Sequence, residues 1–292
     1  MFQNNLLKGK KILITGGGTG LGKEMAPAYA KLGAETVIIG RRESVLQETA
    51  KEIEGETGAK CTPIACDIRV AQAIQDTVDE VWASGPLTGL VNNAAGNFIS
   101  RTKDLSPRGF DAIANIVFHG TFYMTHAVGK KWIEGGHKGS IINILTTWVW
   151  NGSPYVVPSA MSKAAVGVMG QSLAVEWGPH GIRINSICPG AFPTEGMTAR
   201  LNPGQGEKAY SDMSGNPWGR VGQMDELTNL ATFLMADGCD YLTGQTIAID
   251  GAQYQATGGN FSRMSSFTDA DWEAIRGLIK STNEKDKAKR AV

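Results

Sequence analysis

The sequence of 292 residues is 42% hydrophobic and 19% charged, enough apolar side chain to bury a sizeable core, which excludes a disordered, collagenous or coiled-coil protein. Its 28 Lys and Arg residues balance 28 Asp and Glu residues, so a net charge of zero gives no global attraction to nucleic acid or to an anionic membrane. Glycine is enriched, at 37 residues, which predicts many tight turns or close approaches of the backbone to a ligand.

The cysteines and the absence of a targeting signal indicate a reducing compartment. Cys61, Cys66, Cys188 and Cys239 form no CxxC pair and are too few to staple a fold of this size, so we expect buried, reduced thiols. No run of 18 apolar residues is present, and the N-terminus lacks a basic region followed by an apolar stretch. We therefore expect a soluble cytoplasmic protein with no membrane partner. The histidines show no zinc-ligand spacing with the cysteines, so no metal site is predicted.

Seven short, β-rich apolar runs alternate with segments of helical periodicity. The runs span residues 11–14, 36–39, 61–65, 89–92, 140–144, 183–187 and 246–249. Such alternation is typical of a parallel sheet covered by helices on both faces. No linker, repeat or low-complexity segment divides the chain, so we predict a single doubly wound α/β domain over residues 1–292 with a mostly parallel, seven-stranded sheet.

Helices are predicted where apolar residues recur three and four apart. One helix carries on a single face Ile74, Thr77, Val78, Val81 and Trp82. A longer helix, which ends near Gly178-Pro179, carries Met161, Ala164, Ala165, Val168, Met169 and Leu173.

Two stretches interrupt the alternation of strands and helices. Residues 202–218 contain three glycines and two prolines, which predicts a long substrate loop or lid. A C-terminal extension, about residues 252–292, holds one predicted helix over residues 269–279 and a charged end, residues 284–290, that we expect to fray.

A glycine-rich segment, Thr-Gly-Gly-Gly-Thr-Gly-Leu-Gly at residues 15–22, directly follows the first strand and opens a helix predicted to begin near Lys23. Residues without Cβ let the backbone approach a pyrophosphate, while a helix N-terminus offers free N–H groups and a positive dipole end. The alternative is an ordinary glycine-rich turn, but the segment lies where dinucleotide binding requires it. The residues predicted to hold a dinucleotide here are Gly16, Gly18, Thr19, Gly20, Leu21 and Gly22.

The second strand is followed by Arg41 and Arg42, and no acidic residue comes before Glu43. An acidic side chain at this place bonds the ribose hydroxyls of NAD(H), whereas arginines can clamp the 2′-phosphate of NADP(H). We therefore predict NADP(H) as the cofactor. The alternative is a pair of solvated charges at a strand end.

The form T-G-x-x-x-G-x-G of the glycine-rich segment resembles the fingerprint of the short-chain dehydrogenases/reductases, and further motifs of that family follow in order. The resemblance covers roughly residues 7–251 and includes Asp250-Gly251 after the seventh strand. It implies a Rossmann domain that binds a nicotinamide dinucleotide. The cofactor contacts implied are Asp67 at the adenine, Asn93, Ala94 and Gly96 along the cofactor, and Pro189, Gly190 and Thr194 near the nicotinamide.

The catalytic stretch departs from the commonest pattern of that family, which is Tyr-x-x-x-Lys on the helix after the fifth strand. The phenol exchanges the substrate proton, and the lysine holds the nicotinamide ribose and lowers the pKa of the phenol. This sequence has Ser159-Ala160-Met161-Ser162-Lys163, so the lysine is kept and the tyrosine is not. Thr146, thirteen residues before Ser159, stands in the place of the family's catalytic serine and can still donate a hydrogen bond.

A serine in place of the tyrosine, together with residues 93–100 (NAAGNFIS) and 156–159 (VVPS), resembles the 2,4-dienoyl-CoA reductase branch of the family. The resemblance implies reduction of a conjugated dienoyl thioester with NADPH, and hydrogen-bond donors for the thioester oxygen of the resulting dienolate. His119 corresponds to an asparagine that helps to hold the substrate carbonyl in that branch; the alternative is a structural histidine. Tyr155 could supply a phenol or serve only in packing.

The sequence leaves several functions open. The leading hypothesis is an NADPH-dependent reductase of unsaturated acyl-CoA, a 2,4-dienoyl-CoA reductase in fatty-acid degradation, with Trp148 and Trp150 suited to an apolar acyl pocket. The alternatives are a short-chain oxidoreductase for another carbonyl or enoyl substrate, and a weakly catalytic NADP-binding regulatory protein. The helix over residues 159–177 resembles one that pairs subunits in this family, which implies a homotetramer.

Overall fold

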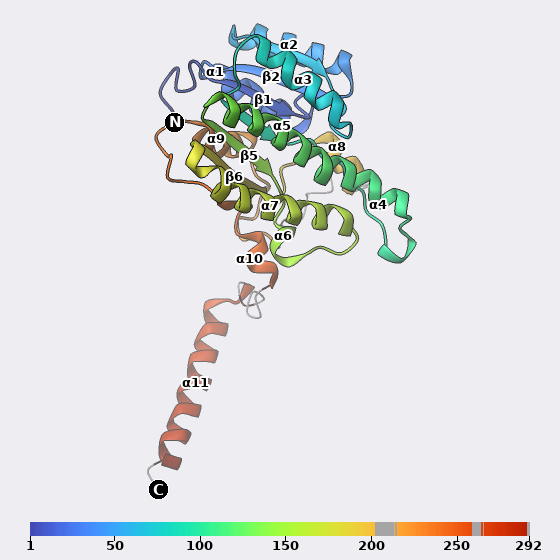
Figure 1. The fold of residues 1–292 in the computed structure, drawn as a ribbon. Coiled ribbons are helices and arrows are strands. Elements are labelled where there is room, and N and C mark those ends of the chain that lie inside the picture. Colours follow the sequence, from blue (N-terminus) through green and yellow to red (C-terminus); the bar gives the residue numbers. More distant parts are fainter. Residues whose placement is uncertain (202–212, 214, 259–263, 265, 291–292) are drawn as a thin grey trace.

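A seven-stranded sheet forms the centre of the structure (Figure 1). The structure is a computed structural model, and it describes residues 1–201, 213, 215–258, 264 and 266–290. The strands are β1 (Lys11–Thr15), β2 (Glu35–Gly40), β3 (Cys61–Ala65), β4 (Gly89–Asn92), β5 (Gly139–Ile144), β6 (Ile182–Pro189) and β7 (Thr246–Ile249). The seven predicted strands are confirmed, with small differences at their ends.

The strand order is β3-β2-β1-β4-β5-β6-β7, and every neighbouring pair is parallel. The chain winds from β1 outward to β3, then returns past β1 and continues on its other side from β4 to β7. The predicted doubly wound α/β fold is therefore confirmed. The reversal makes β1 and β4 the switch point of the sheet, where open α/β sheets form a crevice beyond the carboxyl ends of the strands.

Helices cover both faces of the sheet. The α-helices are α1 (Gly20–Lys31), α2 (Glu43–Thr57), α3 (Ala71–Ala83), α4 (Pro107–Ala114), α5 (Gly120–Gly135), α6 (Trp148–Asn151), α7 (Val157–Trp177), α8 (Glu195–Leu201), α9 (Met224–Met235), α10 (Gln253–Gly258) and α11 (Asp269–Arg290). Short turns of other helix types are η1 (Thr102–Asp104), the π-helical η2 (Asn115–His119) and η3 (Gly178–His180). Ile12 and Ile14 pack in the layer with α1, α2 and α9, whereas Leu13 packs in the layer with α3, α5 and α7.

The start of α1 and the face of α3 test the sequence predictions for helices. In α3, Ile74, Val78 and Val81 are buried as predicted. α1 begins at Gly20, before the expected start near Lys23, because the chain leaves its extended conformation directly after Thr19.

The longer predicted helix is confirmed as α7, which ends at Trp177, but only part of its apolar face packs against the core. Met161 and Val168 are 56% and 61% exposed, whereas Ser159, Ser162 and Lys163 are buried. Apolar and small residues occur around most of the circumference of this helix, so the spacing of its apolar residues could not identify the side that meets the sheet.

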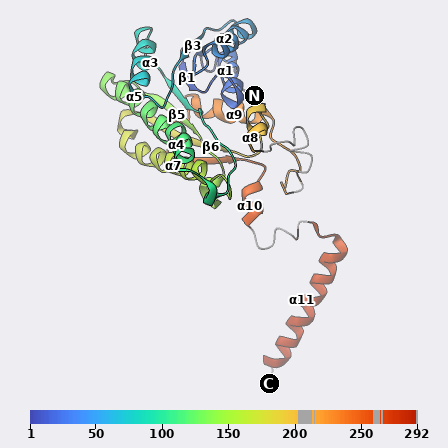
Figure 2. The same ribbon diagram turned by 90° about the vertical axis from the view of Figure 1, so that its right-hand side faces the viewer.

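The C-terminal extension also differs from expectation. Views from two directions show α11 leading away from the sheet (Figures 1 and 2). α11 reaches Arg290, so the predicted end of the helix at residue 279 was wrong. Glu, Lys and Ala, which are good helix formers, dominate this end of the chain. The predicted loop or lid at residues 202–218 lies largely outside the described residues.

The cysteines are free thiols in the structure. Cys61, Cys66 and Cys188 are buried, but Cys239 is half-buried, so the expectation of buried thiols was wrong for that residue. Cys239 lies between α9 and β7, in a connecting segment at the surface.

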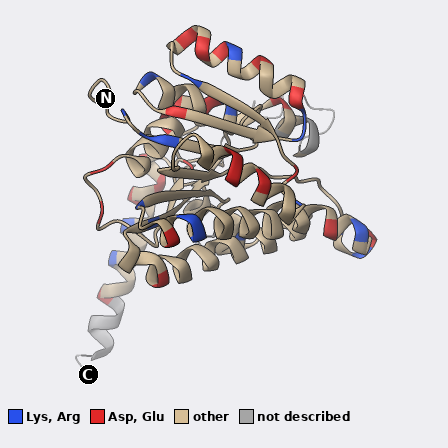
Figure 3. Cartoon of the chain, turned by 45° about the horizontal axis from the view of Figure 1, so that its top comes forward, with Lys and Arg blue, Asp and Glu red and all other residues tan. Residues whose placement is uncertain are grey.

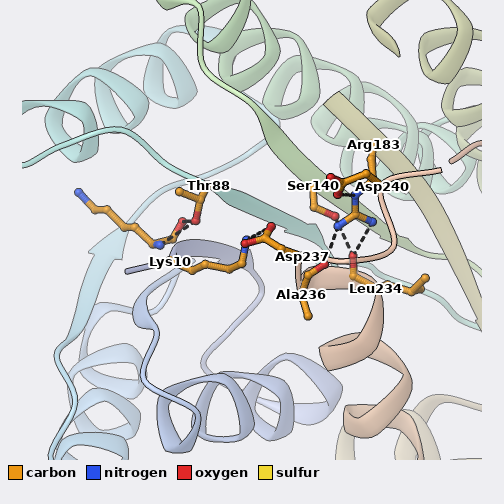
Figure 4. Close-up of polar contacts among 9 residues, drawn as sticks. Lys10, Thr88, Ser140, Arg183, Leu234, Ala236, Asp237 and Asp240 are labelled. Atoms are coloured by element: carbon orange, nitrogen blue, oxygen red, sulfur yellow. Dashed lines mark hydrogen bonds and ion pairs between the residues drawn. The ribbon is translucent and has the colours of Figure 1, made fainter. Parts of the chain in front are cut away.

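Polar contacts at the amino-terminal ends of the strands fasten α9 to the sheet (Figure 4). The buried Arg183 donates from Nη1 to the carbonyl of Leu234 at 3.0 Å and from Nη2 to the carbonyl of Ala236 at 2.9 Å. Ser140 donates to the same Leu234 carbonyl at 2.9 Å, and Asp240 Oδ1 lies 3.6 Å from Arg183 Nε. The last carbonyls of a helix lack intrahelical partners, so the guanidinium of Arg183 caps α9.

A polar seam crosses the apolar centre of the sheet. Asn92 of β4 and Asn143 of β5 are cross-strand partners, and Asn92 Nδ2 donates to Asn143 Oδ1 at 2.9 Å. The same nitrogen donates to Thr125 Oγ1 on α5 at 2.8 Å. Among the described residues, Asn92 Oδ1 and Asn143 Nδ2 have no partner, although both side chains are buried. The seam links the two strands to α5.

The surface carries both signs of charge, and Figure 3 shows Lys and Arg mixed with Asp and Glu along the helices. Within the described ranges, every helix is too short or too polar to cross a bilayer.

Candidate active site

A cavity of about 1290 Å³ opens at the carboxyl ends of the strands. Its walls come from the segments after β1, β2, β3, β4, β5 and β6, from the start of α7 and from α10. Because β2 and β6 lie on opposite sides of the switch point, the cavity runs across the sheet from the loop after β2 to the loop after β6. This is the place where the sequence predicted a dinucleotide.

The loop after β1 approaches the loop after β4 so closely that side chains are excluded at two positions. Gly16 has a φ of +67°, and a Cβ there would lie 3.0 Å from Ala94 Cα. A Cβ on Gly22 would lie 2.6 Å from Asn93 Nδ2. Asn93 holds the two loops together, since its Nδ2 donates to the carbonyl of Thr15 at 2.9 Å. Thr15 Oγ1 also accepts the N–H groups of Asn93 and Ala94, both at 2.9 Å.

The start of α1 forms a cradle with free backbone donors. The predicted residues that line the cavity here are Gly16, Gly18, Thr19, Gly20 and Leu21. Gly22 instead packs beneath the loop against Asn93. Among the described residues no side chain caps α1, and its first turn holds no acidic residue. The first N–H groups of the helix and its positive dipole end therefore fit a pyrophosphate.

Basic residues dominate the end of the cavity beyond β2. Arg41 and Arg42 both line it with exposed side chains, and no carboxylate in the described part of the chain forms an ion pair with either. Asp67 also lines this end, but Arg69 Nε donates to its carboxylate at 2.9 Å. Those hydrogen bonds from Arg69 lower the pKa of Asp67. The guanidinium groups of Arg41 and Arg42, unlike that of Arg69, are not paired with a carboxylate of the described residues and therefore suit a phosphate.

Thr146, Ser159 and Lys163 all line the cavity. Thr146 follows β5, whereas Ser159 and Lys163 lie one turn apart on the buried side of α7. Lys163 Nζ donates to the carbonyl of Ile144 at the end of β5. Burial lowers the pKa of Lys163 to about 8, which brings its titration near the working pH of most enzymes.

Cys188, at the end of β6, lies close to Lys163. Burial raises the pKa of Cys188 to about 12, so the thiol stays neutral although Lys163 is close. Cys188 packs with Leu145 and Val166, a contact that the sequence did not reveal because a buried cysteine gives no motif.

The other predicted cofactor contacts also reach the cavity. Its walls include the residues Asn93, Ala94, Gly96, Pro189, Gly190 and Thr194. A segment that the sequence missed is α10, whose Gln253, Tyr254 and Thr257 complete the wall.

His119 and Tyr155 lie apart from the group of Thr146, Ser159 and Lys163. Among the described residues, the cavity wall includes neither of them. His119 is exposed at the end of η2, with Nδ1 3.4 Å from Tyr123 Oη. Tyr155 is 58% exposed, and its carbonyl accepts the N–H of Ser100 at 2.8 Å. Trp148 lines the cavity, as the hypothesis of an acyl pocket requires, whereas Trp150 lies behind the wall.

A dinucleotide cradle at the switch point and a buried lysine farther along the same cavity define a nicotinamide-dependent oxidoreductase. The chain belongs to the short-chain dehydrogenase/reductase family, and residues 16–252 match the family described as Enoyl-(Acyl carrier protein) reductase.

Relatives of known name agree with this assignment. The chain is 39% identical over 294 residues to a probable 2,4-dienoyl-CoA reductase of Caenorhabditis elegans, covering 99% of this chain and 95% of the relative. It is 40% identical over 251 residues to a probable 2,4-dienoyl-CoA reductase of Bacillus subtilis, covering 84% and 96%.

Solved structures show the same fold. A short-chain dehydrogenase from Bacillus anthracis is similar with a TM-score of 0.76 at 40% identity, covering 84% of this chain and 96% of that one. A gluconate 5-dehydrogenase from Burkholderia cenocepacia, solved in complex with NADP and tartrate, has a TM-score of 0.79 at 32% identity, covering 85% and 96%.

Proposed function

We propose that this protein is an NADPH-dependent 2,4-dienoyl-CoA reductase that acts on unsaturated acyl-CoA thioesters. The observation that carries the proposal is the presence of Ser159 next to Lys163 in the cavity, where most members of the family have a tyrosine. The names of the relatives from C. elegans and B. subtilis support the same substrate class.

The missing phenol favours a conjugated thioester over a simple ketone. Reduction of a ketone creates an alkoxide that needs a proton at once, and a serine hydroxyl is too weak an acid to supply it at neutral pH. In a dienolate the negative charge is delocalised, and hydrogen-bond donors can hold it until water protonates the carbon chain. Thr146 is the donor that we propose in the cavity wall, and Ser159 positions neighbouring groups.

His119 and Tyr155 are proposed as further donors. Both side chains lie outside the cavity wall formed by the described residues, so each would have to turn inward to reach the thioester oxygen. Their contribution is therefore proposed to be smaller than that of Thr146, whose position in the wall requires no rearrangement.

The residues around the cavity suit NADPH in particular. The cofactor, when bound, supplies the hydride for the reduction. We assign Arg41 and Arg42 to its 2′-phosphate, the start of α1 to its pyrophosphate and Lys163 to its nicotinamide ribose. The ammonium of Lys163 also adds positive charge close to the thioester oxygen of the substrate.

Oxidation of NADPH tests the proposal with three substrates: a 2,4-dienoyl-CoA, a 2-enoyl-CoA and a simple ketone. Turnover of the dienoyl-CoA alone is expected. Preferred turnover of the enoyl-CoA or the ketone would favour another short-chain oxidoreductase. Tight NADPH binding with no turnover of any of the three would favour a regulatory protein.

The assembly that we propose is a homotetramer. Met161, Val168 and Val175 form an exposed apolar stripe on α7, and Phe118 and Phe122 are exposed on the neighbouring η2 and α5. Exposed apolar residues grouped in this way are typical of subunit interfaces. Sedimentation equilibrium tests the proposal, and a monomer at micromolar concentration would contradict it.

The compartment that we propose is the cytoplasm. Relatives from Danio rerio and Rattus norvegicus are named peroxisomal 2,4-dienoyl-CoA reductases, at 35% and 33% identity. Fractionation of cells that express the full chain distinguishes the two compartments.

A further inference from the structure

Two short helices, α6 and α10, form the part of the cavity wall that lies across from the arginine end, and a pair of aromatic rings joins them. Trp150 of α6 stacks on Tyr254 of α10 with ring centroids 4.5 Å apart and planes inclined by 23°. Tyr254 lines the cavity, whereas Trp150 stands behind it and is 43% exposed. The inner ring is thus held from the outside by the outer ring.

The turn after β7 fixes the backbone that carries Tyr254. Gly251 and Ala252 both have a φ of +63°, so the chain reverses sharply between β7 and α10. The buried Asp250 carboxylate accepts the N–H of Ala252 at 3.0 Å and the N–H of Tyr254 at 2.9 Å. A left-handed conformation at a non-glycine residue is uncommon, and the Asp250 hydrogen bonds stabilise it here. Tyr254 is therefore restrained by its backbone as well as by its ring.

The chemistry of this wall suits an acyl chain. Beyond Thr146 and Lys163, the large aromatic side chains among the described residues of the wall are Trp148, Phe192 and Tyr254. A thioester held at Thr146 would direct its hydrocarbon chain along these apolar surfaces. An inner ring that is stacked on a second ring cannot turn aside for a longer chain without losing that contact.

We propose that Tyr254, held in place by Trp150, is a specificity-determining residue that limits the length of the acyl chain. This inference rests on the proposed function, because it requires an acyl thioester in the cavity. Tyr254 contacts the apolar end of the substrate, and Trp150 acts through Tyr254 as a positioning residue.

The test compares kcat/KM for 2,4-hexadienoyl-CoA, 2,4-decadienoyl-CoA and 2,4-hexadecadienoyl-CoA in the full-length wild type and in Tyr254→Ala, Trp150→Ala and Tyr254→Phe variants. For both alanine variants we expect the ratio of kcat/KM for the longest to the shortest substrate to rise about tenfold, the gain from contact with roughly two more methylene groups. Tyr254→Phe keeps the stacked ring and should keep the wild-type ratio. Tyr241→Ala, which removes an almost fully exposed tyrosine away from the cavity, is the matched control.

Folding and cofactor binding are measured for every variant by thermal unfolding and NADPH titration. Should Tyr254→Ala fail to fold, Trp150→Ala carries the test, because this substitution leaves every residue that lines the cavity unchanged. An equal loss of kcat/KM for all three substrates would overturn the inference, because Tyr254 would then contact the thioester or the CoA rather than the chain end. An unchanged ratio would overturn it as well, with the proposed function left standing. If the wild type reduces none of the three substrates, the proposed function fails and this inference fails with it.

Discussion

Replacing Lys163 by methionine should change stability and turnover in opposite directions. Burial lowers the pKa of this lysine from 10.5 to about 8, a change that corresponds to about 3 kcal/mol at about 1.4 kcal/mol per pH unit. The folded pKa is the lower one, so below it the buried charge destabilises the folded state in full. Between pH 8 and pH 10.5 the unfolded chain binds more protons than the folded one, and the free energy of unfolding rises with pH.

Urea unfolding of the wild type and of Lys163→Met, from neutral pH to pH 10.5, measures this contribution. The variant should be the more stable protein at neutral pH, by less than about 3 kcal/mol because the Ile144 carbonyl loses a donor. The advantage of the variant should shrink by about 3 kcal/mol as the pH rises, since all other titrating groups are common to both proteins.

Turnover of dienoyl-CoA by Lys163→Met should fall about 100-fold or more, the scale of losing one preorganised electrostatic contact. A stability difference that does not depend on pH would refute the buried charge. A single-turnover rate equal to that of the wild type would refute the proposed role of Lys163 in the reaction.

Three other substitutions test the remaining parts of the site and fold. Arg41→Ala combined with Arg42→Ala should weaken NADPH binding by about 2 kcal/mol or more and leave NADH binding nearly unchanged, because charge-assisted bonds contribute roughly 1.5–3 kcal/mol each when well formed; titration of both cofactors measures this. Thr146→Val should lower the single-turnover rate with dienoyl-CoA substantially more than Ser159→Ala does, because only Thr146 is proposed to donate to the thioester oxygen. Arg183→Met should lower the free energy of unfolding by roughly 3 kcal/mol, because two buried carbonyls lose a charged donor.

Each of these has its own control. Equal affinity of the wild type for NADPH and NADH would contradict the assignment of the two arginines, and an unchanged NADPH affinity is required before the Thr146 and Ser159 rates are compared. For Arg183 the control is Lys10→Met, which breaks the 2.7 Å ion pair with the exposed Asp237 seen in Figure 4. Lys10→Met should cost less than about 1 kcal/mol, and equal effects of the two substitutions would contradict the capping of α9 by Arg183.

The sheet could be predicted from the sequence because its central strands, β1, β4, β5 and β6, are buried on both faces. Continuous apolar runs such as Leu90 and Val91 mark such strands without ambiguity when helical segments separate them. The buried side of α7 could not be predicted in the same way. Ser162 satisfies its hydroxyl by donating to the Pro158 carbonyl at 2.7 Å, and Lys163 donates to Ile144, so polar side chains occupy the buried face.

The glycine-rich loop and the arginines after β2 could be located because they follow strands along the chain. The wall formed by α10 could not, since it depends on the sharp turn at Gly251 and Ala252, and Ala252 is not a residue that signals a left-handed conformation. Thr15 is part of the glycine motif, but the two hydrogen bonds that its hydroxyl accepts from the loop after β4 depend on a strand pairing that sequence spacing does not show.

The seam between Asn92 and Asn143 has a consequence for how the chain folds. Parallel strands made of Ile, Leu and Val can slide past one another by two residues and still bury equivalent side chains, so apolar contacts alone discriminate poorly between alignments. A slide of β4 against β5 would move the amide of Asn92 away from Asn143 and against apolar side chains, where an unpaired amide costs about 1–3 kcal/mol. The two amides therefore specify the register of β4 against β5, because sheets with another register are less stable than the native one.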